Sequence, residues 1–273
     1  MFYINIRATL RKVAHFFLIA QFCYGASSDI VYQLSLRHIV ETKNSGNNEV
    51  SIVSKSGVYL GLDQVAEVGG SSRLELLGPS GELIRVGHYS RFAPIAPNKL
   101  QFTQGSFLLF LHEGAPQYTI AIKGQELKFA AHGTFLCELM KNGGLKVISL
   151  SGEGNLISSP NGAFDKVRPS YVQFFLNNGD NPPAIEIDLA LVVNSCPLIT
   201  LFKDRLPSHL QIQKLAIRQA RTIKLRSNSY VYDALSKDQV RLLVPKGKSD
   251  QEESKPKKTL KNPLTWFRNK IGI

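Results

Sequence analysis

The chain has few of the residues and motifs that most often carry chemistry. Its 273 residues include 3 cysteines, 2 methionines and 1 tryptophan. Its 6 histidines form no His-x-His or His-x-x-x-His pair, so their spacing does not favour a metal site, and His112 and His132 are expected to make polar contacts near turns. The chain has no Gly-x-Ser-x-Gly motif, which is the signature of an α/β-hydrolase. It also has no glycine-rich loop ending in Lys-Ser or Lys-Thr, which is the signature of a P-loop. We therefore expect a protein that is not an enzyme, with no catalytic, metal-binding or cofactor-binding residues.

Carboxylates and aromatic residues leave a carbohydrate-active or carbohydrate-binding protein open as an alternative. A glycosidase needs two facing carboxylates in a cleft, and Glu75 and Glu82 are close in sequence. We expect Glu75 instead to pair with Arg73, and Glu82 with Arg85, across a solvated strand face. The aromatic residues mostly alternate with polar or small residues, which is typical of a sandwich core and has a sugar-stacking strip as its alternative. They are Phe102, Phe107, Phe110, Tyr118, Phe129 and Phe135.

The apolar block at 13–22 is too short to cross a membrane as a helix, which takes about 20 residues. It follows a short basic stretch that ends at Lys12 and precedes the small residues at 25–28. This is the layout of a secretory signal peptide, so we expect cleavage after Ser28 and a mature protein in the periplasm or outside the cell. An uncleaved anchor in the inner membrane is the alternative.

Export places the chain in an oxidising compartment, where disulfides persist. After cleavage only Cys137 and Cys196 remain. Both lie in apolar surroundings along the chain, so we expect two small buried side chains, with one disulfide as the alternative.

Acidic residues are too few to balance the basic ones. The chain has 21 Asp and Glu against 33 Lys and Arg, a net charge of +12 and a pI of about 9.6. No RNA- or DNA-binding motif is present, and we expect no nucleic-acid partner. Part of the excess lies in residues 245–273, which we expect to form a disordered basic tail. The aromatic, basic end of this tail at 263–271 predicts contact with a partner or an anionic membrane surface, with a frayed tail as the alternative.

Short apolar runs, each closed by Gly, Pro, Asn or Ser, recur about every ten residues between Val65 and Asn155. Short strands at this spacing predict a mainly β fold, as a sandwich, barrel or solenoid. The predicted strands are Arg73–Leu77, Leu83–Val86, Leu100–Thr103, Ser106–Leu111, Tyr118–Ile122, Leu127–Ala130, Phe135–Leu139 and Lys146–Leu150, preceded by Ile30–Leu36, Val50–Val53 and Val58–Leu62.

The chain then changes character, and we expect four segments. They are a signal peptide at 1–28, a β domain at 29–157 with its core at 65–155, a mixed β/α region at 158–244, and the basic tail at 245–273.

In the mixed region, Tyr171–Leu176 predicts one last strand and Asp188 predicts the cap of a short helix. Helical spacing of apolar residues predicts an amphipathic helix over 208–224 that begins after Ser208. Residues 240–244 are compatible with a second short helix or a strand. The face of the helix predicted to be buried consists of Ile212, Leu215, Ala216, Gln219 and Ile223.

The order of motifs in the β region resembles the periplasmic domain of the FecR family, named for the ferric-citrate regulator. The step Gly133-Thr134, followed by Gly152, is the most specific part of the resemblance, and we expect both to lie at turns. The resemblance implies an antiparallel β-sandwich or jelly-roll-like domain outside the cytoplasm. The matching elements are Glu67–Leu76, the turn Ser80-Gly81, Ile84–Gly87, Thr103–Phe110, Tyr118–Ile122, Ala131–Phe135 and Leu150–Gly154.

The start of the chain departs from a typical FecR protein, which carries a cytoplasmic sigma-binding segment and then a transmembrane helix. Only Met1–Lys12 precede the apolar block here. The resemblance therefore implies an exported, stand-alone version: a non-enzymatic interaction or signalling module of the cell envelope that binds a protein or an envelope component. The first alternative is a membrane-anchored transmembrane signalling regulator, and the second is a carbohydrate-binding or carbohydrate-active jelly-roll protein.

Overall fold

The structure, a computed structural model, describes residues 30–36, 40–44, 50–53, 58–62, 64–70, 72–158, 163–232 and 241–245. The predicted signal peptide at 1–28 lies outside the described residues, as does the predicted basic tail at 245–273 apart from Pro245, which ends a strand.

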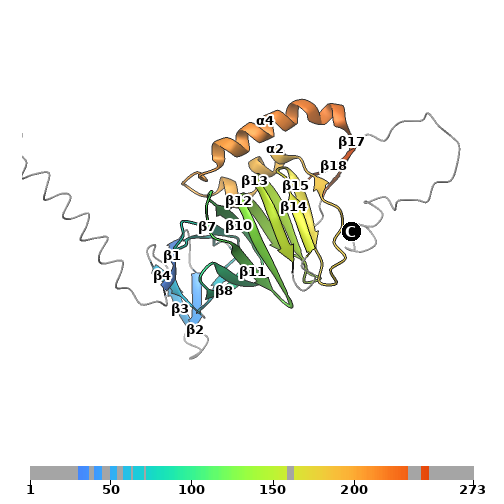
Figure 1. Ribbon diagram of the computed structural model, residues 1–273. Coiled ribbons are helices and arrows are strands. Elements are labelled where there is room, and N and C mark those ends of the chain that lie inside the picture. The colour runs from blue at the N-terminus through green and yellow to red at the C-terminus, as the bar shows by residue number, and fades with distance from the viewer. Residues whose placement is uncertain are drawn as a thin grey trace, which may run out of the picture.

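Most described elements are strands, and the described helices all lie between residues 189 and 226. Figure 1 shows the strands together with α2 and α4. The first nine strands are β1 (Ile30–Leu36), β2 (Val40–Asn44), β3 (Val50–Val53), β4 (Val58–Gly61), β5 (Gln64–Val68), β6 (Leu74–Leu77), β7 (Leu83–Val86), β8 (Arg91–Ala96) and β9 (Lys99–Gln104). They are followed by β10 (Ser106–Leu111), β11 (Tyr118–Ile122), β12 (Gln125–Leu139), β13 (Leu145–Ser158), β14 (Ala163–Val167), β15 (Tyr171–Phe175) and β16 (Ile185–Glu186). The last elements are α2 (Leu189–Ser195), α3 (Pro197–Thr200), α4 (His209–Arg226), β17 (Ser227–Tyr232) and β18 (Arg241–Pro245).

Within the described residues, β1 to β16 form a single 16-stranded sheet, and β17 and β18 form a separate pair. The order along the main path of the sheet is β3-β2-β5-β8-β9-β11-β12-β10-β7-β6-β1-β4, and β13 joins β12 to β14 and β15. The predicted mainly β fold is confirmed. The sheet is mixed rather than purely antiparallel, because β9 and β11 pair in parallel.

One long hairpin, β12–β13, organises this sheet. The turn predicted at Gly133-Thr134 is wrong: both residues lie inside β12, which joins two strands predicted as separate. Gly133 pairs with Gly152 on β13, and the two backbones have φ values of 125° and 77°. The register shifts just beyond, between Thr134 and Phe135. The glycines therefore bend the hairpin at a bulge instead of ending its strands.

The bend divides the hairpin between different neighbours. In the half that contains Phe135, β12 pairs with β10 and β13 pairs with β15. In the half that contains Phe129, β12 pairs with β11 and β13 pairs with β14. The pair of glycines thus marks the place where the sheet changes direction.

Two hydrophobic cores share the strands of this sheet as a common wall. On β10, Phe107 and Leu109 belong to the core inside the curled sheet, whereas Leu108 belongs to the core under the helices. The same alternation occurs on β13, where Val147 faces the first core and Ile148 the second. Strands that are buried on both faces read as continuous apolar runs, which explains the sequence Ser106–Leu111.

The helices form a layer over the outer face of β12, β13 and β15 (Figure 1). The Asp188 side chain accepts a hydrogen bond from the Leu191 amide, which confirms the predicted cap of α2. Ser208 immediately precedes α4, and its carbonyl accepts the bond from the Ile212 amide. No described helix is both long enough and apolar enough to cross a bilayer.

The predicted inner face of α4 is largely confirmed. Ile212, Ala216 and Ile223 are buried, and Leu215 is half-buried. Gln219 is also buried, where its amide donates to the Ile187 carbonyl and its oxygen accepts from the Leu189 amide. A single side chain therefore fixes α4 to the start of α2.

Candidate functional site

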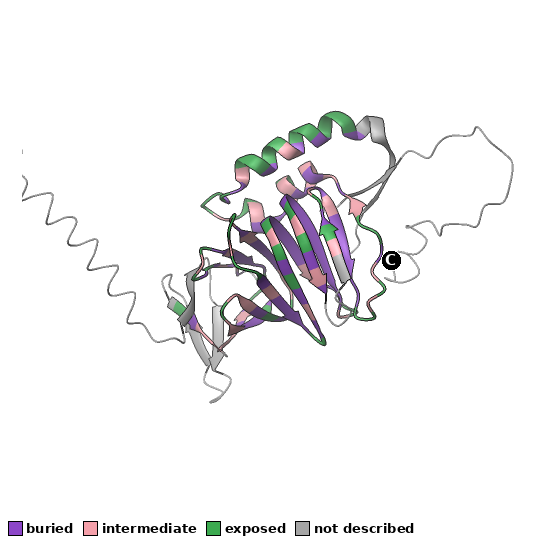
Figure 2. Cartoon of the chain, in the orientation of Figure 1, coloured by how far each residue is buried: buried purple, intermediate pink, exposed green. Residues whose placement is uncertain are grey.

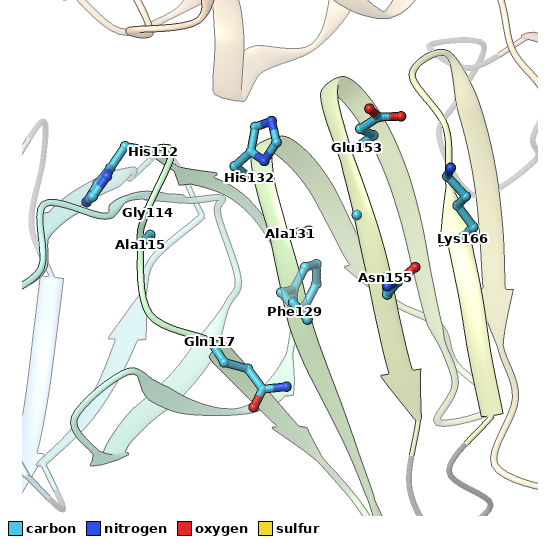
Figure 3. A pocket seen from close by; sticks show the side chains of 12 residues that line it. His112, Gly114, Ala115, Gln117, Phe129, Ala131, His132, Glu153, Asn155 and Lys166 are labelled. Carbon is cyan, nitrogen blue, oxygen red and sulfur yellow. The ribbon is translucent and has the colours of Figure 1, made fainter.

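A pocket of about 540 Å³ opens beside the bend of the long hairpin (Figure 3). The loop between β10 and β11 forms one wall, and strands β12, β13 and β14 form the other. We call this site the bend pocket. Its lining residues are His112, Gly114, Ala115, Gln117, Phe129, Ala130, Ala131, His132, Glu153, Gly154, Asn155 and Lys166.

The register of the strands places the polar side chains of the bend pocket next to one another. His132 is the cross-strand partner of Glu153, directly beside the pair of glycines. Asn155 pairs in register with Lys166 on β14. Directly opposed residues on paired strands have Cβ atoms about 4.5–5.5 Å apart. The pocket therefore presents a histidine, a carboxylate, an amide and an ammonium group at fixed strand spacing.

These side chains are exposed to solvent. They supply hydrogen-bond donors and acceptors and charges of both signs, which suits reversible recognition of a polar ligand. Among the described residues, no group of three or more His, Cys, Asp or Glu side chains is placed to hold a metal ion.

The rim of the bend pocket is tied to the β6–β7 turn by His112. Its Nε2 lies 2.7 Å from the Ser80 carbonyl oxygen, and its Nδ1 lies 2.7 Å from the Glu113 carbonyl oxygen. Both contacts favour a doubly protonated ring, which raises the pKa of His112. The sequence predicted a polar contact near a turn for this residue, and the structure confirms it.

Glu82 lies next to this histidine and is buried, with only 1% of its surface exposed. Its Oε2 accepts a 3.0 Å hydrogen bond from the Ser80 amide, whereas its Oε1 has no hydrogen-bond partner among the described residues. Burial raises the pKa of Glu82, against the lowering effect of backbone hydrogen bonds and of His112. The predicted pair of Glu82 with Arg85 on a solvated face is wrong, because Glu82 turns back into its own turn.

Replacing His112 with glutamine is expected to reduce stability more at about pH 5.5 than at about pH 8.5. The raised pKa of His112 means that the folded state binds the proton more tightly than the unfolded state. Its contribution is therefore present in full below pH 6.5 and is lost as the pH rises through the folded-state pKa. Urea denaturation of both proteins at the two pH values measures the difference.

The control for this experiment is His132→Gln, which removes a histidine from the same pocket and leaves both carbonyl contacts of His112 in place. Each variant is compared with the wild type at the same pH, so the titration of Glu82 is largely common to both. An equal loss of stability for His112→Gln at the two pH values would contradict the assignment.

A second pocket, of about 420 Å³, surrounds an exposed tyrosine. Tyr89 is 63% exposed and has a φ of 54°, a backbone conformation that non-glycine residues rarely adopt. Its ring lies over Gly70, where a Cβ would overlap it. The Glu67–Arg91 ion pair, at 3.3 Å, forms part of the rim. We call this site the tyrosine pocket, and its lining residues are Glu67, Val68, Gly69, Ser72, Tyr89, Ser90, Arg91 and Gln104.

A third polar group lies under the helices and is buried. The Nε of Arg85 donates to Glu75 at 2.7 Å, and its two terminal nitrogens donate to the carbonyl oxygens of Leu198 and Asp204. The guanidinium also lies 4.4 Å from the centre of the Phe202 ring. We call these five residues the arginine cluster; it connects β6 and β7 to the chain around α3.

The arginine cluster corrects the expected partner of Glu75, which is Arg85 on the neighbouring strand and not Arg73. Glu75 and Glu82 therefore do not face each other across a cleft as a pair of glycosidase carboxylates would. The sugar-stacking strip is wrong as well: five of its six aromatic residues are buried, and Phe110 is half-buried.

The two cysteines of the predicted mature chain are free and buried. Cys137 belongs to the core inside the sheet and Cys196 to the core under the helices, so the two thiols lie on opposite sides of the same wall. Burial raises the pKa of both, that of Cys196 to about 11. The predicted buried side chains are confirmed, and the alternative of a disulfide is wrong.

Sequence reasoning missed most of the polar contacts that hold the helical layer. The Thr134 hydroxyl bonds the Ser208 hydroxyl, and Lys146 pairs with Glu138 beneath the helices. A usable signal was present for Arg85, because a charged residue within the apolar run Leu83–Val86 has no solvated face if that strand is buried on both sides.

Together these features define a mainly β protein with a helical layer on one sheet face and open, polar pockets on its surface. No family model matches the chain, and no curated protein is similar to it. Two crystal structures of a protein from Parabacteroides distasonis described as an anti-sigma factor align with parts of it.

The first of these structures, at 1.65 Å resolution, is 8% identical, covers 45% of this chain and 59% of that chain, and has a TM-score of 0.36. The second, at 2.50 Å resolution, is 9% identical, covers 66% of this chain and 97% of that chain, and has the same TM-score of 0.36. A likeness at this level carries no argument about function, and the FecR resemblance stays a prediction from the sequence.

Proposed function

We propose that the protein is a non-enzymatic interaction module of the cell envelope, of the FecR type, which binds a protein or another envelope component through the bend pocket. The observation that carries this proposal is the pocket itself. It is open to solvent and lined by side chains of both charge signs, and the pairing of three strands fixes their spacing.

Recognition fits this pocket better than catalysis does. Groups that act as acids, bases or nucleophiles are usually desolvated and held against a specific partner. His132, Glu153 and Lys166 are instead exposed, as rim residues of binding surfaces are. Their mixture of donors and acceptors suits a polar peptide segment or a polar polymer.

The sequence of residues 1–28 supports the cell envelope as the place where the protein acts. The basic, apolar and small-residue segments of 1–28 have the order of a secretory signal peptide. The periplasm or the cell exterior is therefore the proposed location. An uncleaved, membrane-anchored regulator is the alternative, and an exported protein whose first residue is Asp29 would rule it out.

Site-specific photocrosslinking tests the bend pocket in cells that express the full chain. A photoreactive phenylalanine at Asn155, inside the pocket, is expected to give a discrete crosslinked product. The same residue at Lys141, which is exposed in a turn away from the pocket, is the control. Products that are identical at both positions, or absent at both, would contradict the proposal.

The partner identified in this way is then purified and its affinity measured. Glu153→Ala is expected to weaken binding about 10-fold, in the range that loss of a polar contact within an interface produces. Lys141→Ala is expected to bind as the wild type does. Because Glu153 is exposed on its strand, neither variant should change the thermal midpoint by more than a few degrees.

Carbohydrate binding is a second candidate, and the tyrosine pocket is the specific observation in its favour. An exposed aromatic ring beside carboxylate, guanidinium and amide groups suits stacking against a sugar ring and hydrogen bonding to its hydroxyls. On a glycan array, Tyr89→Ala is expected to lose any signal that Tyr59→Ala, a similarly exposed tyrosine on β4, retains. A wild-type protein that binds no glycan would remove this candidate.

A further inference from the structure

The outer face of α4 carries an ordered stripe of side chains that the bend pocket does not use. Leu210, Lys214, Ile217 and Arg221 follow one another at intervals of four, three and four residues. At about 100° of rotation per residue, all four fall within about 60° of arc on the helix. The stripe lies on the side opposite the buried Ile212 and Ala216. We call it the outer stripe.

All four side chains of the outer stripe are exposed to solvent. Leu210 is 67% exposed and Ile217 is 57% exposed, although both are large and apolar. Figure 2 shows the exposed residues of α4 along the side turned away from the sheet, and no described element covers that side. The stripe extends about 16 Å along the helix axis, from a rise of about 1.5 Å per residue.

The charge of α4 has one sign. The helix of 18 residues contains Lys214, Arg218, Arg221, Lys224 and Arg226 and no Asp or Glu. The loop just before it adds exposed Lys203 and Arg205 against one acid, Asp204. A surface of this kind favours an anionic partner.

The alternation of apolar and cationic side chains selects among anionic partners. A helix that lies flat at a bilayer surface places apolar side chains at the boundary of the acyl chains, and Lys or Arg side chains reach the phosphates around them. Protein interfaces are enriched in aromatic residues and depleted in lysine, and the outer stripe has no aromatic residue. We propose that the outer stripe of α4 docks the protein on an anionic phospholipid surface.

Vesicle co-sedimentation of the full chain tests this proposal. One set of vesicles contains equal parts of phosphatidylglycerol and phosphatidylcholine, and the other contains phosphatidylcholine alone. The wild type is expected to bind the first set more tightly, and less so at high salt. Lys214→Gln/Arg221→Gln is expected to weaken binding to the anionic vesicles at least about 10-fold, from about 1 kcal/mol for each cation near the surface.

Two further variants separate the outer stripe from other basic segments of the chain. Leu210→Asn/Ile217→Asn keeps every charge and is expected to weaken binding by a similar factor, because it removes the side chains that enter the bilayer. Lys123→Gln/Lys141→Gln removes two exposed cations elsewhere and is expected to weaken binding only slightly. Circular dichroism verifies that all variants are folded.

Each of the other outcomes would overturn the proposal. If the wild type bound neither set of vesicles, or bound both equally, the protein would have no docking preference for an anionic lipid surface. Equal binding by the wild type and Lys214→Gln/Arg221→Gln would place the lipid contact elsewhere in the chain. Loss with the charge variant but not with Leu210→Asn/Ile217→Asn would assign α4 to an anionic partner other than a bilayer. The bend pocket is on other elements, so none of these results affects the proposed function.

Discussion

Replacing Arg85 with methionine is expected to lower the free energy of unfolding by about 3–5 kcal/mol, the usual cost of removing one partner of a buried ion pair. The guanidinium is fully buried, and its loss leaves the Glu75 carboxylate and two carbonyl oxygens without their donor. Urea denaturation followed by circular dichroism measures the change.

Two companion variants separate the charge from the volume of Arg85. Glu75→Gln keeps a hydrogen-bond acceptor beside the guanidinium, so a smaller loss is expected, on the order of 1 kcal/mol. The double variant Glu75→Leu/Arg85→Met is expected to be more stable than Arg85→Met alone, because no half-buried carboxylate remains unpaired. A stability of Arg85→Met within about 0.5 kcal/mol of the wild type would show that the arginine cluster does not hold the helical layer.

Substituting alanine for either glycine at the bend of the hairpin is expected to cost about 2–5 kcal/mol, from a strained φ and an overpacked contact together. A Cβ on Gly133 would lie closer than 3.0 Å to the Ser151 carbonyl oxygen, and one on Gly152 closer than 3.0 Å to that of His132. Both obstacles are backbone atoms of the paired strand, which cannot rotate aside. Thermal and chemical denaturation of the two variants measure the loss.

Gly124→Ala is the matched control for the bend. Gly124 has a φ of 74°, close to that of Gly152, but a Cβ there would meet no atom of the described residues within 4 Å. Only the cost of the backbone conformation remains, about 1–2 kcal/mol. If Gly152→Ala and Gly124→Ala lost the same stability, the close approach of the two strands would not be the reason for glycine at position 152.

Much of the strand pattern was accessible from the sequence because each run is short and bounded. Ser106–Leu111 and Tyr118–Ile122 have the predicted limits, since turn residues close them on both sides. The helix after Ser208 was also predicted, because its apolar residues repeat at a spacing that only one helical face accommodates, although α4 extends to Arg226, two residues beyond the predicted end.

The bend and the buried charges were not predictable in the same way. Gly133 and Gly152 are indistinguishable in sequence from turn glycines, and only the pairing of the two strands shows that they oppose each other. Arg85 was assigned to a solvated face because alternation along one strand cannot reveal a second layer that covers its other side. The layer consists of residues more than 100 positions further on, among them Leu198 and Asp204.

The bend pocket illustrates the same limit for function. Gln117, His132, Asn155 and Lys166 come from three strands and a loop, and no short motif contains them. The spacing that brings them together is the register of β12, β13 and β14. Catalytic sequence motifs therefore do not indicate this pocket, whereas the pairing of the three strands shows which side chains line it.

The wall that the two cores share has a consequence for how the chain can be shortened. A fragment that ended at Ser158 would retain most of the inner core, losing Val167 and Phe175, but would leave Leu108, Leu136 and Ile148 facing water on the other side of the sheet. Contiguous apolar patches of this kind promote self-association of soluble proteins. The helices after Asp188 therefore cover this apolar face of the sheet. A shortened version of the protein must keep these helices or cover the face in another way.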